Sequence, residues 1–183
     1  NTLVQNEASH FGGLYEVGSQ HHSELRFFDA SNEDVQVVSA SELNAYPGTV
    51  MQRTMAIIKD EEFEKAFLLD LFRVTSETEN QYDLPYYYLG QILKANIDFQ
   101  TPEALQALGE ENGYQHLYLE AAGTADFSNV KFSWMDSGKF YTLTAVVEAE
   151  DEILLVRIGA NDPEFNLRRD PAIIFRRPEA RDT

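Results

Sequence analysis

The stretch VKFSW at residues 130–134 places an apolar residue at every second position, and YTLTA at residues 141–145 repeats the pattern. Successive side chains of a β-strand point to opposite faces of a sheet, so this period of two is typical of strands with one buried face. Between the two stretches, Asp136-Ser-Gly138 has residue types that favour a turn. The two stretches therefore predict half-buried strands with a turn between them.

Eight further stretches have the composition of strands and are separated by similar turn residues. They lie at residues 25–28, 35–39, 52–59, 66–74, 90–99, 116–121, 153–159 and 172–176. About ten strands at short spacing are typical of an antiparallel β-sandwich. We therefore predict an all-β fold, an antiparallel sandwich that forms a single domain over residues 1–183.

One stretch departs from the strand pattern. Thr101 is a good N-cap residue, Pro102 suits the first position of a helix, and Gly109 suits its end. The sequence therefore predicts one short helix between Thr101 and Gly109.

The composition excludes several classes of protein. The chain has 183 residues, of which 43% are hydrophobic, and this is enough to bury a core without disulfides. It contains no Cys, which excludes a thiolate nucleophile and a Cys-based zinc site. No stretch approaches the roughly 18 uncharged apolar residues of a membrane span. For this reason we expect no membrane as partner. The net charge of -17 opposes binding to phosphates, so we expect no nucleic acid as partner either.

The segment around Tyr46 is a candidate for proton transfer. Tyr46 precedes the Pro47-Gly48 turn, and Arg53 follows at the start of a predicted strand. We expect Tyr46 to be exposed in this loop. The reference pKa of tyrosine is about 10, and a nearby cation favours the phenolate, so the two residues are a plausible acid/base pair. From composition and spacing alone, a tyrosine packed over a turn is the more frequent arrangement.

Two other groups of residues are candidates for binding. The stretch YDLPYYY at residues 82–88 contains Tyr86 and Tyr87, which would stack on sugar rings or equally form one edge of the core. A metal site needs two or three histidines that converge with a carboxylate. Of the four histidines, His10 is one that could meet Asp29 in space, but the sequence shows only their separation.

Several of these stretches, taken in order, resemble a known family. The stretches YPGTVMQRTM, FLLDLFRV and QYDLPYYY, at residues 46–55, 67–74 and 81–88, resemble the C-terminal β-domain of heparinase II/III-like polysaccharide lyases. The stretches NTLV, SHFGG, GYQHL and GANDPEFNLR, at residues 1–4, 9–13, 113–117 and 159–168, resemble the oligoalginate lyase branch. The resemblance covers most of the chain.

The resemblance implies that the chain belongs to a longer enzyme. Members of the family place an N-terminal α/α toroid before this β-domain, and the active site lies between the two. The chain also begins at Asn1 without an initiating Met, so we expect a piece of a longer protein. The implied partners are the helical domain of the same protein and an anionic polysaccharide or oligosaccharide. The implied location is the periplasm or the outside of the cell.

The resemblance also implies a reaction and roles for residues. The reaction is β-elimination of uronate polymers such as alginate, and Tyr46 best matches the loop tyrosine that protonates the leaving oxygen. Arg53 would line the substrate cleft and offset the acidic charge, together with Tyr86 and Tyr87 as substrate-binding residues. The family also tends to hold a structural zinc ion, for which His10 and Asp29 are the remaining ligand candidates.

Two alternatives to a lyase domain stay open. The first is a non-catalytic carbohydrate-binding β-sandwich module, in which residues 86–88 form a stacking platform. The second is a purely structural domain that supports a partner.

Overall fold

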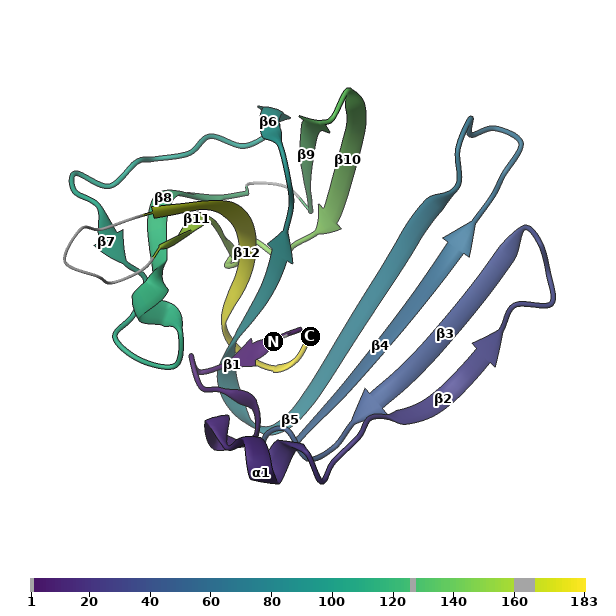
Figure 1. Ribbon diagram of the computed structural model, residues 1–183, viewed down its shortest axis with the longest axis horizontal. Helices are drawn as coiled ribbons and strands as arrows, with labels where there is room; N and C mark the ends of the chain where they lie inside the picture. The colour runs from purple at the N-terminus through teal and green to yellow at the C-terminus, as the bar shows by residue number, and fades with distance from the viewer. Residues whose placement is uncertain (1, 126–127, 160–166) are drawn as a thin grey trace. The chain divides into compact units, whose positions relative to one another are not determined.

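A computed structural model describes residues 2–125, 128–159 and 167–183, of which residues 167–169 are described by their backbone only (Figure 1). Its elements are β1 (Val4–Gln5), η1 (His10–Gly13), α1 (Tyr15–Gly18), β2 (Glu24–Asp29), β3 (Val35–Glu42), β4 (Thr49–Ile58), β5 (Phe67–Tyr87), β6 (Gln91–Ala95), β7 (Gln106–Ala107), η2 (Tyr114–His116), β8 (Leu117–Thr124), β9 (Asn129–Asp136), β10 (Lys139–Val146), β11 (Glu152–Gly159) and β12 (Leu167–Asp182). The prediction of an all-β antiparallel fold is confirmed, and each of the ten predicted strands has its counterpart.

The chain divides into two compact units, which are described separately. The open-sheet unit comprises residues 10–80 and 180–183, and the sandwich unit comprises residues 1–9 and 81–179. The long strands β5 and β12 contribute residues to both units, so one continuous strand order, β2-β3-β4-β5-β12-β11-β8-β7, runs through them. The assignment of residues 1–183 to one domain stays a prediction.

The open-sheet unit is built from β2, β3, β4 and the first part of β5. Neighbouring strands are antiparallel, with Val35 opposite Ile58 and Ile58 opposite Phe67 at the ends of their pairs. Val74 and Thr183 exchange two backbone hydrogen bonds of 2.7 and 3.0 Å, which attaches the last residues of the chain to β5.

The sandwich unit contains the main hydrophobic core. It lies between the three-stranded sheet β6-β9-β10 and the strands β5, β11 and β12. Val130 and Phe132 of β9, Ile153 of β11 and Ile173 of β12 are at most 1% exposed. Full burial of such a side chain contributes about 1.5–3 kcal/mol to the free energy of unfolding. The alternating stretch at residues 130–134 thus points its apolar face into this core, as its period predicts.

Strands β11 and β12 are buried on both faces. Ile153 and Leu155 pack into the main core, whereas Leu154 and Val156 pack into a second cluster with Ala172 and Ile174. Strands that are covered on both faces have continuous apolar runs rather than alternation. This explains the runs ILLV and AIIF at residues 153–156 and 172–175.

The predicted helix between Thr101 and Gly109 is wrong. Within this segment β7 pairs with β8, and the Leu108 N–H donates to the Leu117 carbonyl at 2.7 Å. The Leu108 side chain packs against the second cluster of the sandwich unit. Helix nucleation is costly, and a body of so few residues gains few internal hydrogen bonds. Pairing with the edge of a sheet therefore stabilises this segment more than a short helix would, despite the capping residues. The α-helical turn of the described chain is α1, at Tyr15–Gly18.

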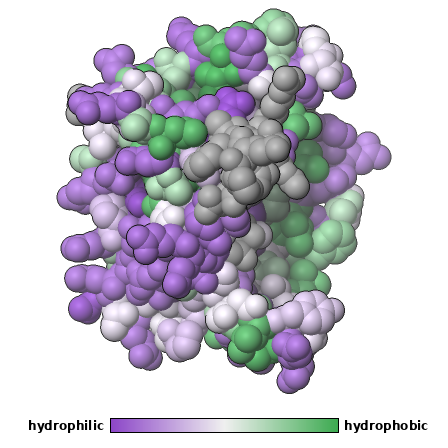
Figure 2. All heavy atoms as spheres, turned by 60° about the vertical axis from the view of Figure 1, so that its left-hand side comes forward, coloured by the Kyte–Doolittle hydropathy of each residue, from purple (hydrophilic) through white to green (hydrophobic). Residues whose placement is uncertain are grey.

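Acidic charge marks the surface. Hydrophilic side chains cover much of the face shown in Figure 2, in keeping with 31 acidic and 14 basic residues in the chain. No helix in the described part of the chain is long and apolar enough to cross a membrane. A surface of this sign repels polyanions at a distance, which bears on the substrate considered below.

Candidate functional site

The structure brings His10 and Tyr46 together in the open-sheet unit. The His10 ring, in η1, meets the Tyr46 ring edge-on with 5.1 Å between centroids and an interplanar angle of 90°. The Phe11 N–H donates to the Ala45 carbonyl at 2.9 Å, and this bond holds η1 against the loop before β4. Two segments that lie 36 positions apart in the sequence thus meet at one point.

The segment beside this contact has an unusual backbone. Phe11, Gly12 and Gly13 all have positive φ, at 55°, 64° and 75°. Glycine adopts this region freely, but a phenylalanine there is strained and persists only where its surroundings hold it. The Phe11 ring stacks on His21 with 5.4 Å between centroids and an interplanar angle of 4°. We call His10, Phe11, His21 and Tyr46 the His10–Tyr46 cluster.

The expectation that Tyr46 is exposed is wrong. Tyr46 is only 5% exposed, because the His10 ring packs against its ring and the neighbouring Ala45 is bound by η1. A turn sequence such as Pro47-Gly48 predicts where the backbone reverses, but not what packs on the residue before it.

Arg53 is engaged elsewhere. Its Nε and Nη2 atoms donate to the two carboxylate oxygens of Asp70 at 2.9 and 2.6 Å, and its guanidinium lies 5.5 Å from the centre of the Phe72 ring. A substrate carboxylate at Arg53 would have to compete with Asp70 for the same donors. The binding role of Arg53 stays a prediction.

The structure separates Tyr86 from Tyr87. Tyr86 packs against the main core of the sandwich unit together with Tyr88, whereas Tyr87 is 56% exposed. Neighbouring residues of a strand point to opposite faces, so the side chains of Tyr86 and Tyr87 cannot form one stacking platform.

In the described part of the chain, the residues suggested for zinc are not grouped with further ligand residues. Asp29 is the last residue of β2, and this end of the strand lies away from α1, which follows η1 in the chain (Figure 1). Its Oδ1 accepts hydrogen bonds from the N–H and the hydroxyl of Ser31 at 2.8 and 2.6 Å. These bonds lower the pKa of Asp29. Among the described residues, no three His, Cys, Asp or Glu side chains are grouped for a metal ion. A zinc ion stays a prediction, and we derive no chemical step from it.

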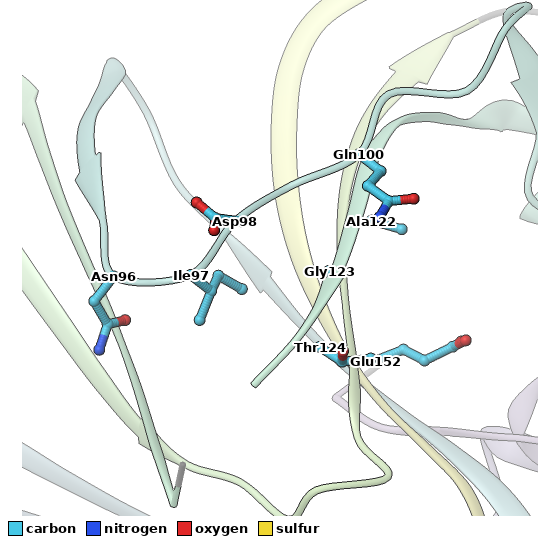
Figure 3. A pocket seen from close by; sticks show the side chains of 8 residues that line it. All are labelled: Asn96, Ile97, Asp98, Gln100, Ala122, Gly123, Thr124 and Glu152. Carbon is cyan, nitrogen blue, oxygen red and sulfur yellow. The ribbon is translucent and has the colours of Figure 1, made fainter. Parts of the chain in front are cut away.

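A wide pocket in the sandwich unit has no ionisable side chains that point toward one another among its lining residues. Figure 3 shows its lining, in which the Asp98 and Glu152 carboxylates lie on opposite sides and point apart. A Cβ at Gly123 would come within 2.6 Å of the Asp98 carbonyl, so glycine there permits the close approach of the lining loop. The side chain of Asn96 accepts from the Lys131 N–H at 2.7 Å and is part of the scaffold. This pocket does not resemble a catalytic site.

Sequence reasoning missed a buried charge network in the sandwich unit. Asp83 is 1% exposed, and its carboxylate accepts two hydrogen bonds from Arg176 at 2.8 Å each and one from the Tyr114 hydroxyl at 2.6 Å. Arg176 also donates to Glu7 at 2.9 Å. Burial, together with the charge of Asp83, raises the pKa of Tyr114, so this hydroxyl stays a donor at any ordinary pH. A charged residue inside the tyrosine-rich stretch 82–88 was the available signal.

Two curated proteins match almost the whole chain. It is 40% identical over 177 residues, 96% of its length, to a protein named alginate lyase from Stenotrophomonas maltophilia (strain K279a). It is 34% identical over 185 aligned residues, 99% of its length, to one named exo-oligoalginate lyase from Saccharophagus degradans (strain 2-40). The chain is similar to alginate lyases.

The similarity to alginate lyases has a definite extent. The matched region is 24% of the first relative and 25% of the second, so the chain spans about a quarter of their length. No family model matches the chain, and the resemblance to the heparinase II/III-like family stays a prediction. Of the stretches that carry it, most of residues 159–168 lies outside the described residues.

Proposed function

We propose that this chain is the β-domain of a lyase that cleaves alginate by β-elimination, with an active site shared with another part of the same polypeptide. The observation that carries the proposal is the identity of 40% and 34% with two alginate lyases over nearly the whole chain. An anionic uronate oligosaccharide or polysaccharide is then the substrate. The periplasm or the outside of the cell stays the predicted location.

The reaction sets requirements that the chain must help to meet. The proton at C5 of a uronate becomes acidic when hydrogen-bond donors neutralise the adjacent carboxylate. A base then takes this proton, the bond between C4 and the glycosidic oxygen breaks, and an acid protonates the departing oxygen. The product carries a new double bond between C4 and C5, and no water is consumed.

In this proposal Tyr46 is the general acid. Its phenol is protonated at neutral pH by its reference pKa of about 10, and the edge-on His10 ring restricts its orientation. Because Tyr46 is only 5% exposed and the His10 ring packs on it, we expect His10 to move when the leaving oxygen reaches the Tyr46 hydroxyl. The positive φ of Phe11 is a strained backbone conformation of the kind that accumulates at functional sites.

In this proposal, the part of the active site that lies outside this chain must supply positive charge as well as catalytic groups. The chain carries a net charge of -17, which slows the approach of a polyanion. Among the described ion pairs, Arg53, Arg157, Arg176 and Arg177 already bind carboxylates of the chain. Donors that neutralise the uronate carboxylate are therefore expected from the remaining length of the longer protein, for which we propose a helical domain.

The open-sheet unit supports a role within a longer protein. Large apolar side chains are exposed on both of its faces: the register places Phe28, Val38, Ile57 and Leu68 on one face and Phe27, Val35, Phe67, Leu69 and Leu71 on the other. Runs such as FLL at residues 67–69 have the pattern that β11 and β12 show, where both faces are covered. We infer that further parts of the same polypeptide cover this sheet.

Polar substitutions on this sheet test its coverage. Phe28→Thr with Leu68→Thr keeps residue types that suit strands but removes two side chains that are 66% and 50% exposed. In the 183-residue chain we expect a change of about 0.5 kcal/mol or less in the free energy of unfolding, with weaker binding of the dye ANS. In the longer protein each substitution should cost about 1.5–3 kcal/mol. Equal effects in both proteins would show that nothing covers this face.

The proposed reaction is tested by the ultraviolet absorbance of the unsaturated uronate. Short alginate oligomers are incubated with the 183-residue chain and with the longer polypeptide that contains it. We expect product from the longer form and little or none from the chain alone. No product from either form, while circular dichroism shows both to be folded, would exclude alginate elimination and favour a carbohydrate-binding module.

A further inference from the structure

A smaller pocket in the sandwich unit is unused by the proposed elimination. Its volume is about 230 Å³, below the roughly 300–1,000 Å³ of sites for drug-sized ligands. Its polar and aromatic lining comes from two segments, β5 with Asp83 and Tyr87, and the turn and η2 with Asn112, Tyr114 and His116. The remaining lining is apolar and includes Val4, Pro85, Leu117, Ile158 and Ile174. A ring-sized group with one apolar face and polar edges suits such a space.

Tyr87 provides an aromatic surface in this pocket. It is 56% exposed, although its neighbours on either side, Tyr86 in β5 and Tyr88 just after it, pack against the main core. The partial burial of its phenol raises its pKa, so its hydroxyl remains an uncharged donor at neutral pH. An aromatic residue that a strand turns away from the core presents its ring to a ligand without rearrangement.

The second segment of the lining, the turn with η2, is held in place by buried bonds. Tyr114, which is 4% exposed, is anchored through its hydroxyl to Asp83, and Arg176 clamps Asp83 in turn. Asn112 and Gly113 have positive φ of 55° and 95°, which forms the sharp turn before η2. Asn112 and His116 thus flank an anchored residue, and such support preorganises a binding site.

We propose that this pocket binds one pyranose ring of a carbohydrate chain, with the C–H face of the sugar on Tyr87 and its hydroxyl groups on Asn112 and His116. The choice of a uronate as that sugar rests on the proposed function. The carboxylate in the lining, that of Asp83, is already paired with Arg176. Stacking and hydrogen bonds therefore carry the recognition, and a neutral sugar of the same shape also fits.

The test compares a trisaccharide of mannuronate with β-1,4-mannotriose, which differs by having a hydroxymethyl group in place of each carboxylate. Each probe is titrated into the 183-residue chain by calorimetry at low and at high salt. We expect the dissociation constant of mannotriose to change little with salt. At high salt, where the repulsion between the acidic chain and the anionic probe is screened, the two dissociation constants should agree within about threefold.

Variants assign the binding to this pocket. Tyr87→Ala should weaken binding of both probes about tenfold or more, whereas Tyr87→Phe, which keeps the ring, should stay within about threefold. Asn112→Gly removes the amide and still permits the positive φ, and we expect several-fold weaker binding. Phe140→Ala is the control, since Phe140 is a 75% exposed aromatic residue of the same unit that does not line the pocket.

Two results would overturn the proposal. One is that the folded chain binds neither trisaccharide. The other is that Tyr87→Ala and Asn112→Gly, with unchanged circular dichroism, bind as tightly as the unaltered chain. Failure of the proposed elimination would leave these titrations unaffected, because they measure binding without product. A subsite and a lyase activity can therefore fail independently.

Discussion

Replacing Tyr46 with Phe in the longer protein is expected to lower kcat for cleavage of alginate oligomers by roughly 10²–10⁴-fold, the usual contribution of general acid–base catalysis. Phenylalanine keeps the ring that meets His10 but has no proton to give to the leaving oxygen. The interaction concerns the transition state, so we expect kcat and kcat/KM to fall together and KM to change little. The measurement is the initial rate of ultraviolet absorbance of the unsaturated product.

Tyr118→Phe is the matched control. Tyr118 is 4% exposed, close to the 5% of Tyr46, and belongs to the sandwich unit. This variant also removes one hydroxyl from a buried ring, and we expect its rate to stay within about threefold of the unaltered protein. If Tyr46→Phe retained full activity in a folded protein, Tyr46 would not be the general acid. Equal losses in both variants would indicate a loss of folding instead.

Asp83→Asn is expected to lower the free energy of unfolding of the sandwich unit by about 3–5 kcal/mol, the usual cost of breaking a buried ion pair. The carboxylate of Asp83 accepts from Arg176 and Tyr114, and an amide cannot accept at both of its ends. Of its counter-charges among the described residues, the Arg176 side chain, 12% exposed, would then keep Glu7. Urea unfolding followed by fluorescence of Trp134 measures this effect, because the single Trp packs between Tyr88 and Tyr141.

Glu120→Gln serves as the control for this effect. Glu120 binds Arg157 through two hydrogen bonds of 2.6 and 3.1 Å, but the side chains are 38% and 33% exposed. Exposed pairs contribute about 0–1 kcal/mol, so we expect a small loss. If Asp83→Asn and Glu120→Gln lowered the free energy of unfolding by similar amounts, burial of the ion pair would not be the cause of the effect. The double variant Asp83→Leu with Arg176→Met should be more stable than Asp83→Asn, because it leaves no unpaired charge in the buried part of the network, and Glu7, which loses Arg176, is 34% exposed.

Much of the fold followed from local patterns. The alternation at residues 130–134 and 141–145 became β9 and β10 of the sandwich, with Val130 and Phe132 fully buried. The same reasoning gave a wrong result at residues 101–109. Three local capping residues predicted a helix there, but contacts with distant residues, which a sequence does not show, determined the structure. Leu108 packs against residues of β11 and β12, and no local pattern reveals a partner so far along the chain.

The sequence identified which residues belong to the candidate site, but it did not predict how buried they are or what they contact. The sequence singled out His10, Tyr46 and Tyr87, but it placed Tyr46 in solvent and joined Tyr86 with Tyr87. The structure buries Tyr46 beneath His10, turns Tyr86 and Tyr87 to opposite faces of β5, and leaves Asp29 in a turn with Ser31. Each difference depends on which residue of a distant segment packs against the one in question.

The sequence by itself determined the strands, their antiparallel character and the turns between them, because backbone conformation and the period of buried positions are local properties. Only the tertiary structure decided that Glu7, Asp83, Tyr114 and Arg176 form one network, with members up to 169 positions apart. The register between distant strands sets such contacts, and a shift of one residue would turn each side chain to the other face.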